Sequence, residues 1–174
     1  RKDLAFFGQF GKKGVGYYVA ELKESIGNIL GLDQHWNVAI IGMGHLGAAL
    51  ANYQGIARLG FHLVAIFDVN PVVIGTRVGE RRVEDIAYLA EIIAERDVQI
   101  GVIAVPAAHA QDVADQLVAA GIRGIWNFAP IKLQVPPNVP FVSEDLSVGL
   151  SSLSYYLTHT SAENEELSDQ NSSN

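Results

Sequence analysis

Apolar residues from position 38 onward fall either in short continuous runs or at helical spacing. Residues 38–41 form an uninterrupted apolar run, which is typical of a strand buried on both faces of a parallel sheet. A glycine-rich loop follows, and then the proline-free segment 45–59, which we expect to be one helix that Gly60 ends. Residues 63–67 predict a second strand ending at Asp68. Together these elements make one strand–helix–strand unit.

The same alternation continues to residue 142. The further expected elements are a helix over 83–96, a strand over 100–105, a helix over 108–120, a strand over 124–128 and a short last strand over 139–142. Pro136, Pro137 and Pro140 bracket that last strand as turn or edge residues. Repeated alternation predicts an α/β fold over residues 36–144, a Rossmann-like, doubly wound and mostly parallel sheet. Its ligand crevice is expected at the carboxyl ends of the strands.

The amino-terminal residues 1–33 read as a separate small unit. Residues 1–7 have the pattern of a helix end, residues 8–16 form a glycine-rich loop, and a second helix follows up to Gly31. Because the chain begins at Arg1 and runs at once into patterned sequence, we expect this unit to be the end of a longer domain.

The carboxyl-terminal segment predicts one more helix, over residues 145–159. Asp145 has the side chain of a helix cap, and the leucines at positions 146, 150, 153 and 157 fall on one stripe. Residues 160–174 are rich in Ser, Asn, Glu and Asp, so we expect an acidic, disordered tail there.

Composition narrows the class of protein. Hydrophobic residues make up 49% of the 174 positions, but no apolar run approaches the roughly 18 residues of a membrane span. Cysteine is absent and no secretory leader is visible, which favours a cytoplasmic protein without disulfides. The net charge of −7 is uneven, with a basic start and no Lys or Arg after Lys132.

The glycine loop carries the strongest functional signal. Gly42, Gly44 and Gly47 have GxGxxG spacing, with Met43, His45 and Leu46 between them, directly after a predicted strand and at the start of a predicted helix. In that context the loop is typical of dinucleotide binding, with the pyrophosphate on the helix N-terminus. Asp68 follows roughly 20 residues after Gly47, where a carboxylate binds a ribose 2′-hydroxyl and favours NAD over NADP. The alternative is that the glycines serve only packing and Asp68 is a solvated loop acid.

Two later strand ends are expected to line the same crevice. Val105 and Pro106 end one strand with a rigid turn, and Asn127 and Phe128 end the next, offering an amide and a ring toward a nicotinamide. Pro106 as an ordinary strand terminator and Phe128 as a core residue remain open alternatives.

Residues for redox chemistry are not apparent beside the expected cofactor. No Tyr is followed four residues later by a Lys, and none of His35, His45, His62, His109 and His159 has an evident carboxylate partner in sequence. No Cys/His metal spacing is present either. A dinucleotide without a reactive partner favours sensing over turnover, so we expect no enzyme and no metal.

A basic loop suggests a second partner. Lys12 and Lys13 stand at the tip of the glycine-rich turn, after a helix that carries Arg1 and Lys2. A helix with a basic wing is typical of DNA binding, where the helix enters the major groove and the lysines contact the backbone. A flexible surface turn with solvated lysines explains the same charges.

The chain resembles the Rex family of redox-sensing transcriptional repressors over nearly its whole length. The matching segments are Arg1-Lys2-Asp3-Leu4 with Phe7-Gly8, Gly14-Val15-Gly16-Tyr17, Ile41-Gly42-Met43-Gly44 with Leu46-Gly47, Phe67-Asp68, Val105-Pro106, and Gly121-Ile122 with Asn127-Phe128-Ala129-Pro130. The resemblance implies that residues 1–33 end a winged-helix DNA-binding domain, with Arg1 and Lys2 in its recognition helix and Lys12 and Lys13 in its wing.

The resemblance also implies a homodimer in which the helix over 145–159 is exchanged between subunits. Family members hold operator DNA when NADH is low and release it when NADH binds. Tyr53 and Asp145 match the positions of the family's charged switch, although by their own pattern Tyr53 reads as a mid-helix core residue and Asp145 as a helix cap. An NAD-dependent oxidoreductase fragment and a CoA- or nucleotide-binding module are the competing interpretations.

Overall fold

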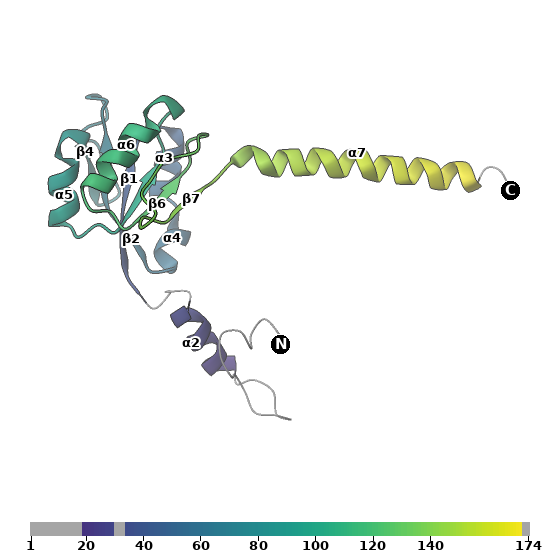
Figure 1. Cartoon of the computed structure of the whole chain (residues 1–174), viewed down its shortest axis with the longest axis horizontal. Helices are drawn as coiled ribbons and strands as arrows, with labels where there is room; N and C mark the ends of the chain where they lie inside the picture. Colours follow the sequence, from purple (N-terminus) through teal and green to yellow (C-terminus); the bar gives the residue numbers. More distant parts are fainter. Residues whose placement is uncertain (1–18, 30–33, 172–174) are drawn as a thin grey trace.

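The computed structural model describes residues 19–29 and 34–171, with side chains for 19–20, 22–28 and 34–159. A layered α/β body forms the centre of the molecule, and helix α2 (Val19–Ile29) precedes it. Helix α7 (Leu146–Asn171) follows the body and projects away from it as a long rod (Figure 1).

The body is built on one seven-stranded sheet. Its strands are β1 (Trp36–Ile41), β2 (Phe61–Asp68), β3 (Arg77–Val78), β4 (Arg81–Asp85), β5 (Ile100–Ile103), β6 (Gly124–Asn127) and β7 (Phe141–Ser143). They lie in the order β3-β4-β2-β1-β5-β6-β7, and every pairing is parallel except that of β3 with β4. This order reverses direction at β1, which is the hallmark of a doubly wound Rossmann-like sheet, so the predicted fold class is confirmed.

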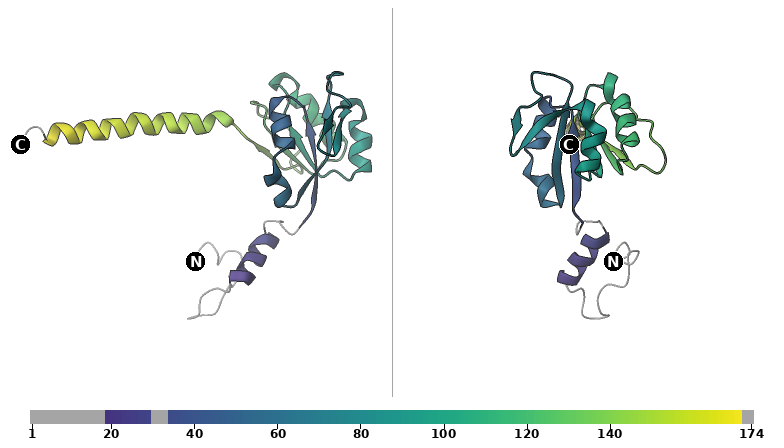
Figure 2. Two further views of the ribbon diagram at one scale, coloured as in Figure 1. Left: turned by 180° about the vertical axis from the view of Figure 1, so that it is seen from behind. Right: turned by 90° about the vertical axis from the view of Figure 1, so that its left-hand side faces the viewer.

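Helices cover both faces of the sheet, which explains the continuous apolar run in β1. Ala39 and Ile41 point to the face covered by α5 (Leu89–Glu95) and α6 (Ala107–Ala119). Val38 and Ile40 point to the other face, where Leu50 of α3 (His45–Ala51) packs. Figure 2 shows the two helical layers on either side of the strands. Because both faces are buried, alternation of polar and apolar residues is lost in β1.

The predicted single helix over residues 45–59 is wrong, because two short helices replace it. Helix α3 ends at Ala51 and α4 spans Gln54–Arg58. Asn52 ends α3 by donating from its side-chain amide to the Ala48 carbonyl at 2.8 Å, and Tyr53 is extended, with φ −79° and ψ 103°. Tyr53 is 64% exposed rather than a core residue. The break therefore presents a tyrosine ring to the surface.

The predicted helix over residues 83–96 is also wrong in its first half. Val83 lies in β4, where it pairs with Ile66 of β2, and the α-helix begins only at Leu89 after the short 3-10 turn η1 (Ile86–Tyr88). Asp85 caps that turn by accepting a hydrogen bond from the Ala87 amide. Val83, Ile86 and Leu89 are spaced as on one face of a helix although only Leu89 is α-helical. This spacing made the sequence pattern predict a helix from residue 83.

The remaining elements agree with the pattern within one to three residues at each bound, except for β3, which the pattern did not predict, and for the end of α7. The strands β2, β5 and β6 and the helix α6 are those expected, while β7 begins at Phe141 instead of residue 139. The expected disordered tail over residues 160–174 is wrong as far as Asn171, because α7 continues to that residue instead of ending at His159. Residues 160–171 contain no Gly or Pro and include helix-forming Ala, Glu and Leu. Along the described residues, no helix combines the length and apolarity that crossing a membrane requires.

Candidate functional site

The glycine loop between β1 and α3 makes two backbone approaches that only glycine permits. Gly42 has φ +98°, and a Cβ there would lie 2.6 Å from the Ala104 carbonyl oxygen. A Cβ at Gly47 would lie 1.9 Å from the Gly42 carbonyl oxygen. Both positions therefore hold the loop tightly against the sheet and the start of the helix.

Gly44 has a different role, because it faces open space. A Cβ built there meets no atom within 4 Å, and the residue is exposed at the amino-terminal end of α3. Nothing within the domain requires glycine at this position. The absence of a side chain matters only to a molecule that approaches the loop from outside.

Asp68 ends β2 and is bonded to the glycine loop. Its Oδ2 accepts a hydrogen bond from the Met43 amide at 2.6 Å, and its Oδ1 accepts one from the Asn70 amide at 2.8 Å. The first bond ties the carboxylate to the glycine loop, while the second is an Asx turn of the kind that exposed loop aspartates also make. Each carboxylate oxygen keeps a further lone pair, which can accept a bond from a ligand hydroxyl.

These residues open on a cleft of about 430 Å³ at the carboxyl ends of β1, β2 and β5. Gly42, Gly44, Asp68, Val105 and Pro106 all line it, although they are far apart in the sequence. Carboxyl ends of parallel strands meet at one edge of a sheet, and the cleft lies at β1, where the strand order reverses. The structure thus brings together five of the residues singled out from the sequence.

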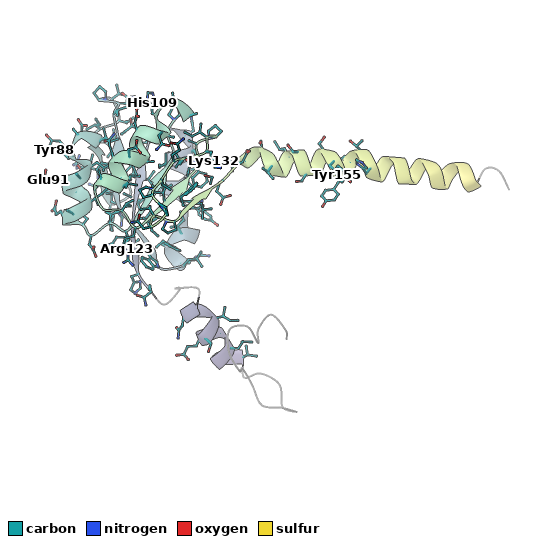
Figure 3. All side chains as sticks on the ribbon, viewed as in Figure 1. Tyr88, Glu91, His109, Arg123, Lys132 and Tyr155 are labelled. Atoms are coloured by element: carbon teal, nitrogen blue, oxygen red, sulfur yellow. The ribbon has the colours of Figure 1, made fainter. Side chains whose placement is uncertain are left out.

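The cleft has further walls that sequence reasoning missed. Val69 and Ile86 line one side, and His109, Asp112 and Gln116 of α6 line another. Figure 3 shows His109 at the end of the body away from α2. The three α6 residues repeat at spacings of three and four, beside the buried stripe of Ala110, Val113 and Leu117. That polar stripe is a signal in the sequence that would have found them.

Five other predicted residues lie outside the lining of this cleft, and one of them is Gly47, which packs against Gly42 as described above. His45 and Leu46 begin α3 and are exposed and half-buried, respectively. Phe128 packs against Val38, Ile40 and Val102 on the opposite face of the sheet, so its alternative role as a core residue is the one observed. Asn127 is completely buried.

Asn127 organises the turn after β6 instead of facing a ligand. Its amide nitrogen donates to the carbonyls of Ala129 and Ile131 and to the Ser143 hydroxyl, and its side-chain oxygen accepts from the Ala129 amide at 3.0 Å. The side chain is therefore buried within the turn and bonded through both its nitrogen and its oxygen, instead of being presented to the cleft. The expected contact with a nicotinamide is not one that this arrangement offers.

We expect Asn127→Ala to lower the free energy of unfolding by about 2–4 kcal/mol, because it leaves several buried groups without partners. Urea denaturation followed by circular dichroism measures the change. Asn52→Ala is the matched control, since the exposed Asn52 amide makes a single bond to Ala48 and should cost under about 1 kcal/mol. Equal losses in the two variants would contradict the buried network.

The other predicted residues lie away from the cleft or outside the described structure. Asp145 precedes α7 and is exposed, and hydrogen bonds from the Ser147 hydroxyl and amide lower the pKa of its carboxyl, as expected of a helix cap. Tyr53 lies at the break between α3 and α4. The four DNA-binding candidates, Arg1, Lys2, Lys12 and Lys13, fall outside the described residues.

The chemistry of the cleft suits binding. It combines an apolar floor, one carboxylate tied to the loop backbone and an open approach at Gly44. Over the described part of the chain, no three His, Asp or Glu side chains gather as metal ligands would.

Comparison with known proteins gives relatives along nearly the whole chain. The family model described as CoA binding domain matches residues 33–131. The redox-sensing transcriptional repressor Rex of Carboxydothermus hydrogenoformans is 50% identical over 155 residues, which cover 89% of this chain and 74% of the relative. The Rex repressor of Clostridium perfringens is 46% identical over 159 residues, which cover 91% and 75%.

Solved structures of the repressor RSP are similar as well. RSP in complex with β-NAD⁺ and operator DNA has a TM-score of 0.88 and 42% identity, covering 95% of this chain and 76% of that one. RSP in complex with β-NADH has a TM-score of 0.85 and 40% identity, covering 94% and 76%.

Proposed function

We propose, since this chain belongs to the Rex family of redox-sensing transcriptional repressors, that it reads the ratio of NADH to NAD⁺ and represses transcription accordingly. The protein holds operator DNA while NADH is low and releases it when NADH binds. The observation that carries this proposal is the likeness over 95% of the chain to RSP, which was solved with NAD⁺ and operator DNA and also with NADH. Relatives named as repressors make this a regulator and not an enzyme. We also propose a cytoplasmic location, because a repressor must reach its operator DNA.

In this proposal the cleft at β1 holds the dinucleotide. The pyrophosphate lies over Gly44 and the amides up to Gly47, because no side chain of residue 44 obstructs that approach. The adenosine ribose lies at Asp68, whose carboxylate accepts its hydroxyls and repels a 2′-phosphate. Val105 and Pro106 form a wall of the same cleft. His45 and Leu46 contribute through the backbone at the start of α3.

The DNA contacts belong to the amino-terminal unit. Arg1 and Lys2 in the recognition helix, together with Lys12 and Lys13 in the wing, supply positive charge for the phosphates of an operator. The chain spans about three quarters of the length of the Rex relatives that it matches.

The protein is further proposed to be a homodimer that exchanges α7. Leu146, Leu150, Leu153 and Leu157 form one stripe of this helix and are between 54% and 71% exposed. The body also has an open apolar groove of about 530 Å³, lined in part by Ile56, Trp126 and Val142. A helix stripe and a groove that are both apolar and open to solvent are surfaces that a second copy can bury. Asp145 precedes this helix and Tyr53 lines the groove, so a dimer brings the proposed switch residues to its interface.

We expect the double variant Leu150→Glu and Leu157→Glu to convert the dimer to a monomer, because it places two charges on the apolar stripe. Sedimentation equilibrium measures the mass, and Ser151→Glu, an exposed change off that stripe, is the matched control. Dimers of unchanged stability in the double variant would contradict the exchange of α7.

The central test of function uses the full-length protein. We expect it to shift a palindromic operator in an electrophoretic assay, and NADH but not NAD⁺ at equal concentration to abolish the shift. Isothermal titration should give tighter binding of NADH than of NAD⁺. A shift that is insensitive to NADH would reject the sensing function, and NADH consumption with carbonyl substrates, followed at 340 nm, would support an oxidoreductase instead.

CoA is the competing ligand, because the matched family model is described as a CoA binding domain. CoA carries a phosphate on the 3′-oxygen of its ribose, so Asp68 would face like charge in the proposed ribose site. We expect CoA to bind the chain more weakly than NADH in the same titration. The reverse order would favour a CoA-binding module.

A further inference from the structure

His35 and His62 form a contact that the dinucleotide function does not use. Nδ1 of His35 lies 3.1 Å from Nε2 of His62, and the ring centroids are 5.1 Å apart with planes inclined at 52°. Both residues are exposed. Two imidazole nitrogens therefore face each other at the surface, accessible from solvent.

The pair lies at the amino-terminal ends of the strands, on the side of the sheet opposite the cofactor cleft. His35 directly precedes β1 and His62 is the second residue of β2, so both stand at the amino-terminal ends of parallel strands. The cleft, by contrast, lies at the carboxyl ends of the same strands. Figure 1 shows the start of β1 at the end of the body nearer to α2. The pair thus joins the entry of β1 to the neighbouring strand.

We propose that His35 and His62 chelate a late first-row divalent cation of the Cu²⁺, Ni²⁺ or Zn²⁺ class. Metal–imidazole bonds are about 2.0–2.1 Å long, so two nitrogens 3.1 Å apart subtend roughly 95–100° at a shared metal ion. That angle suits adjacent ligands in square-planar or tetragonal Cu²⁺ and Ni²⁺ geometry and a distorted tetrahedron around Zn²⁺. The spacing of the pair is therefore that of two neighbouring ligands.

The protonation chemistry of the pair allows a metal ion to replace the hydrogen bond between the two rings. In the hydrogen bond, one of the two facing nitrogens carries the proton and the other accepts it. A metal ion requires both facing nitrogens unprotonated, so the proton of the donor ring moves to its other nitrogen, with no net release from a neutral pair. Small ring rotations then turn both lone pairs to the ion, which the exposure of the two rings allows.

Two protein ligands make an open site. Over the described residues no third His, Cys, Asp or Glu side chain joins the pair, so water would complete the coordination shell of the bound ion. Imidazole nitrogen favours late transition metals over Mg²⁺ and Ca²⁺, and Cu²⁺ binds most tightly in this series. The site is thus selective by ligand type, and it is independent of the dinucleotide cleft.

The test is titration of the 174-residue chain with CuCl₂, followed by electron paramagnetic resonance. We expect one equivalent of Cu²⁺ to show coupling to two imidazole nitrogens. His35→Gln and His62→Gln should each weaken that binding by about tenfold or more, because each removes half of the protein ligands. His159→Gln is the matched control, since His159 is exposed and stacks on Tyr155, and it should leave the binding unchanged.

Two outcomes would overturn the proposal. One is a wild-type affinity no higher than that of the His35→Gln/His62→Gln double variant, and the other is a single-imidazole signal in the wild type. Folding is checked independently by NADH titration, because a site on the opposite sheet edge should leave dinucleotide affinity within twofold. Binding of Mg²⁺ in place of Cu²⁺ would also reject the ligand class.

Discussion

Replacing Gly42 by alanine is expected to lower the free energy of unfolding by about 3–5 kcal/mol and to leave much of the domain unfolded at 37 °C. Two costs combine. The backbone at φ +98° strains any residue with a Cβ, and that Cβ would lie 2.6 Å from the Ala104 carbonyl oxygen and 2.9 Å from Cγ1 of Val105. Neither strand can retreat, because β1 and β5 are paired in the centre of the sheet.

Two matched variants separate the causes. Gly75→Ala imposes a similar strain at φ +83° but has open space around its Cβ, so it should cost only about 1–2 kcal/mol. Gly44→Ala imposes neither backbone strain nor a Cβ clash, so it should fold like the wild type. It should weaken NADH binding by about tenfold or more, because the added methyl group collides with the pyrophosphate. Thermal unfolding and isothermal titration measure the two effects. If Gly44→Ala bound NADH normally, the proposed path of the pyrophosphate would be wrong.

Asp68→Ala is expected to weaken NADH binding by about 10- to 100-fold, because a bond between a carboxylate and a sugar hydroxyl contributes about 1.5–3 kcal/mol. It also releases the Met43 and Asn70 amides from their acceptor, so the glycine loop keeps only its backbone bond from Gly42 to the Phe67 carbonyl as a link to β2. Asp68→Asn keeps an acceptor oxygen but removes the charge. That variant should bind NADH more weakly and discriminate less against NADPH.

Asp112→Asn is the control for general electrostatics. Asp112 lines the same cleft, and its loss removes one negative charge near a negatively charged ligand, so NADH affinity should stay the same or rise. Fluorescence titration of the three variants with NADH and NADPH provides the comparison. Similar losses in Asp112→Asn and Asp68→Asn would show that Asp68 has no specific contact with the ribose.

The part of the site that the sequence predicted is the part that depends on local geometry. A strand, a glycine loop, a helix start and an acid at the end of the next strand are each set by residues close in sequence, and Gly42, Gly44, Gly47 and Asp68 were identified from them. The fold class followed for a similar reason, because a parallel sheet with two covered faces requires continuous apolar strands such as β1.

The errors arose where distant contacts override local pattern. Val83 has helical spacing to Leu89 yet lies in a strand, because β2 offers it a pairing partner. From the sequence, Asn127 looked like an amide that faces a ligand. In the structure its side chain bonds instead to Ala129, Ile131 and Ser143, which hold the turn after β6. Asn52 ends α3 through its side chain, so that Tyr53 reaches the surface.

The sequence by itself determined the fold class, the strands β1, β2, β5 and β6, the helix α6 and the position of the glycine loop, because periodicity and turn chemistry act over a few residues. Only the tertiary structure decided which side chains share the cleft. His109 and Asp112 join Asp68 there because α6 packs beside the carboxyl end of β5, and His35 meets His62 because β1 and β2 run side by side. Such contacts depend on how whole helices and strands pack. That packing is decided by many residues that are distant in the sequence, so local pattern does not reveal it.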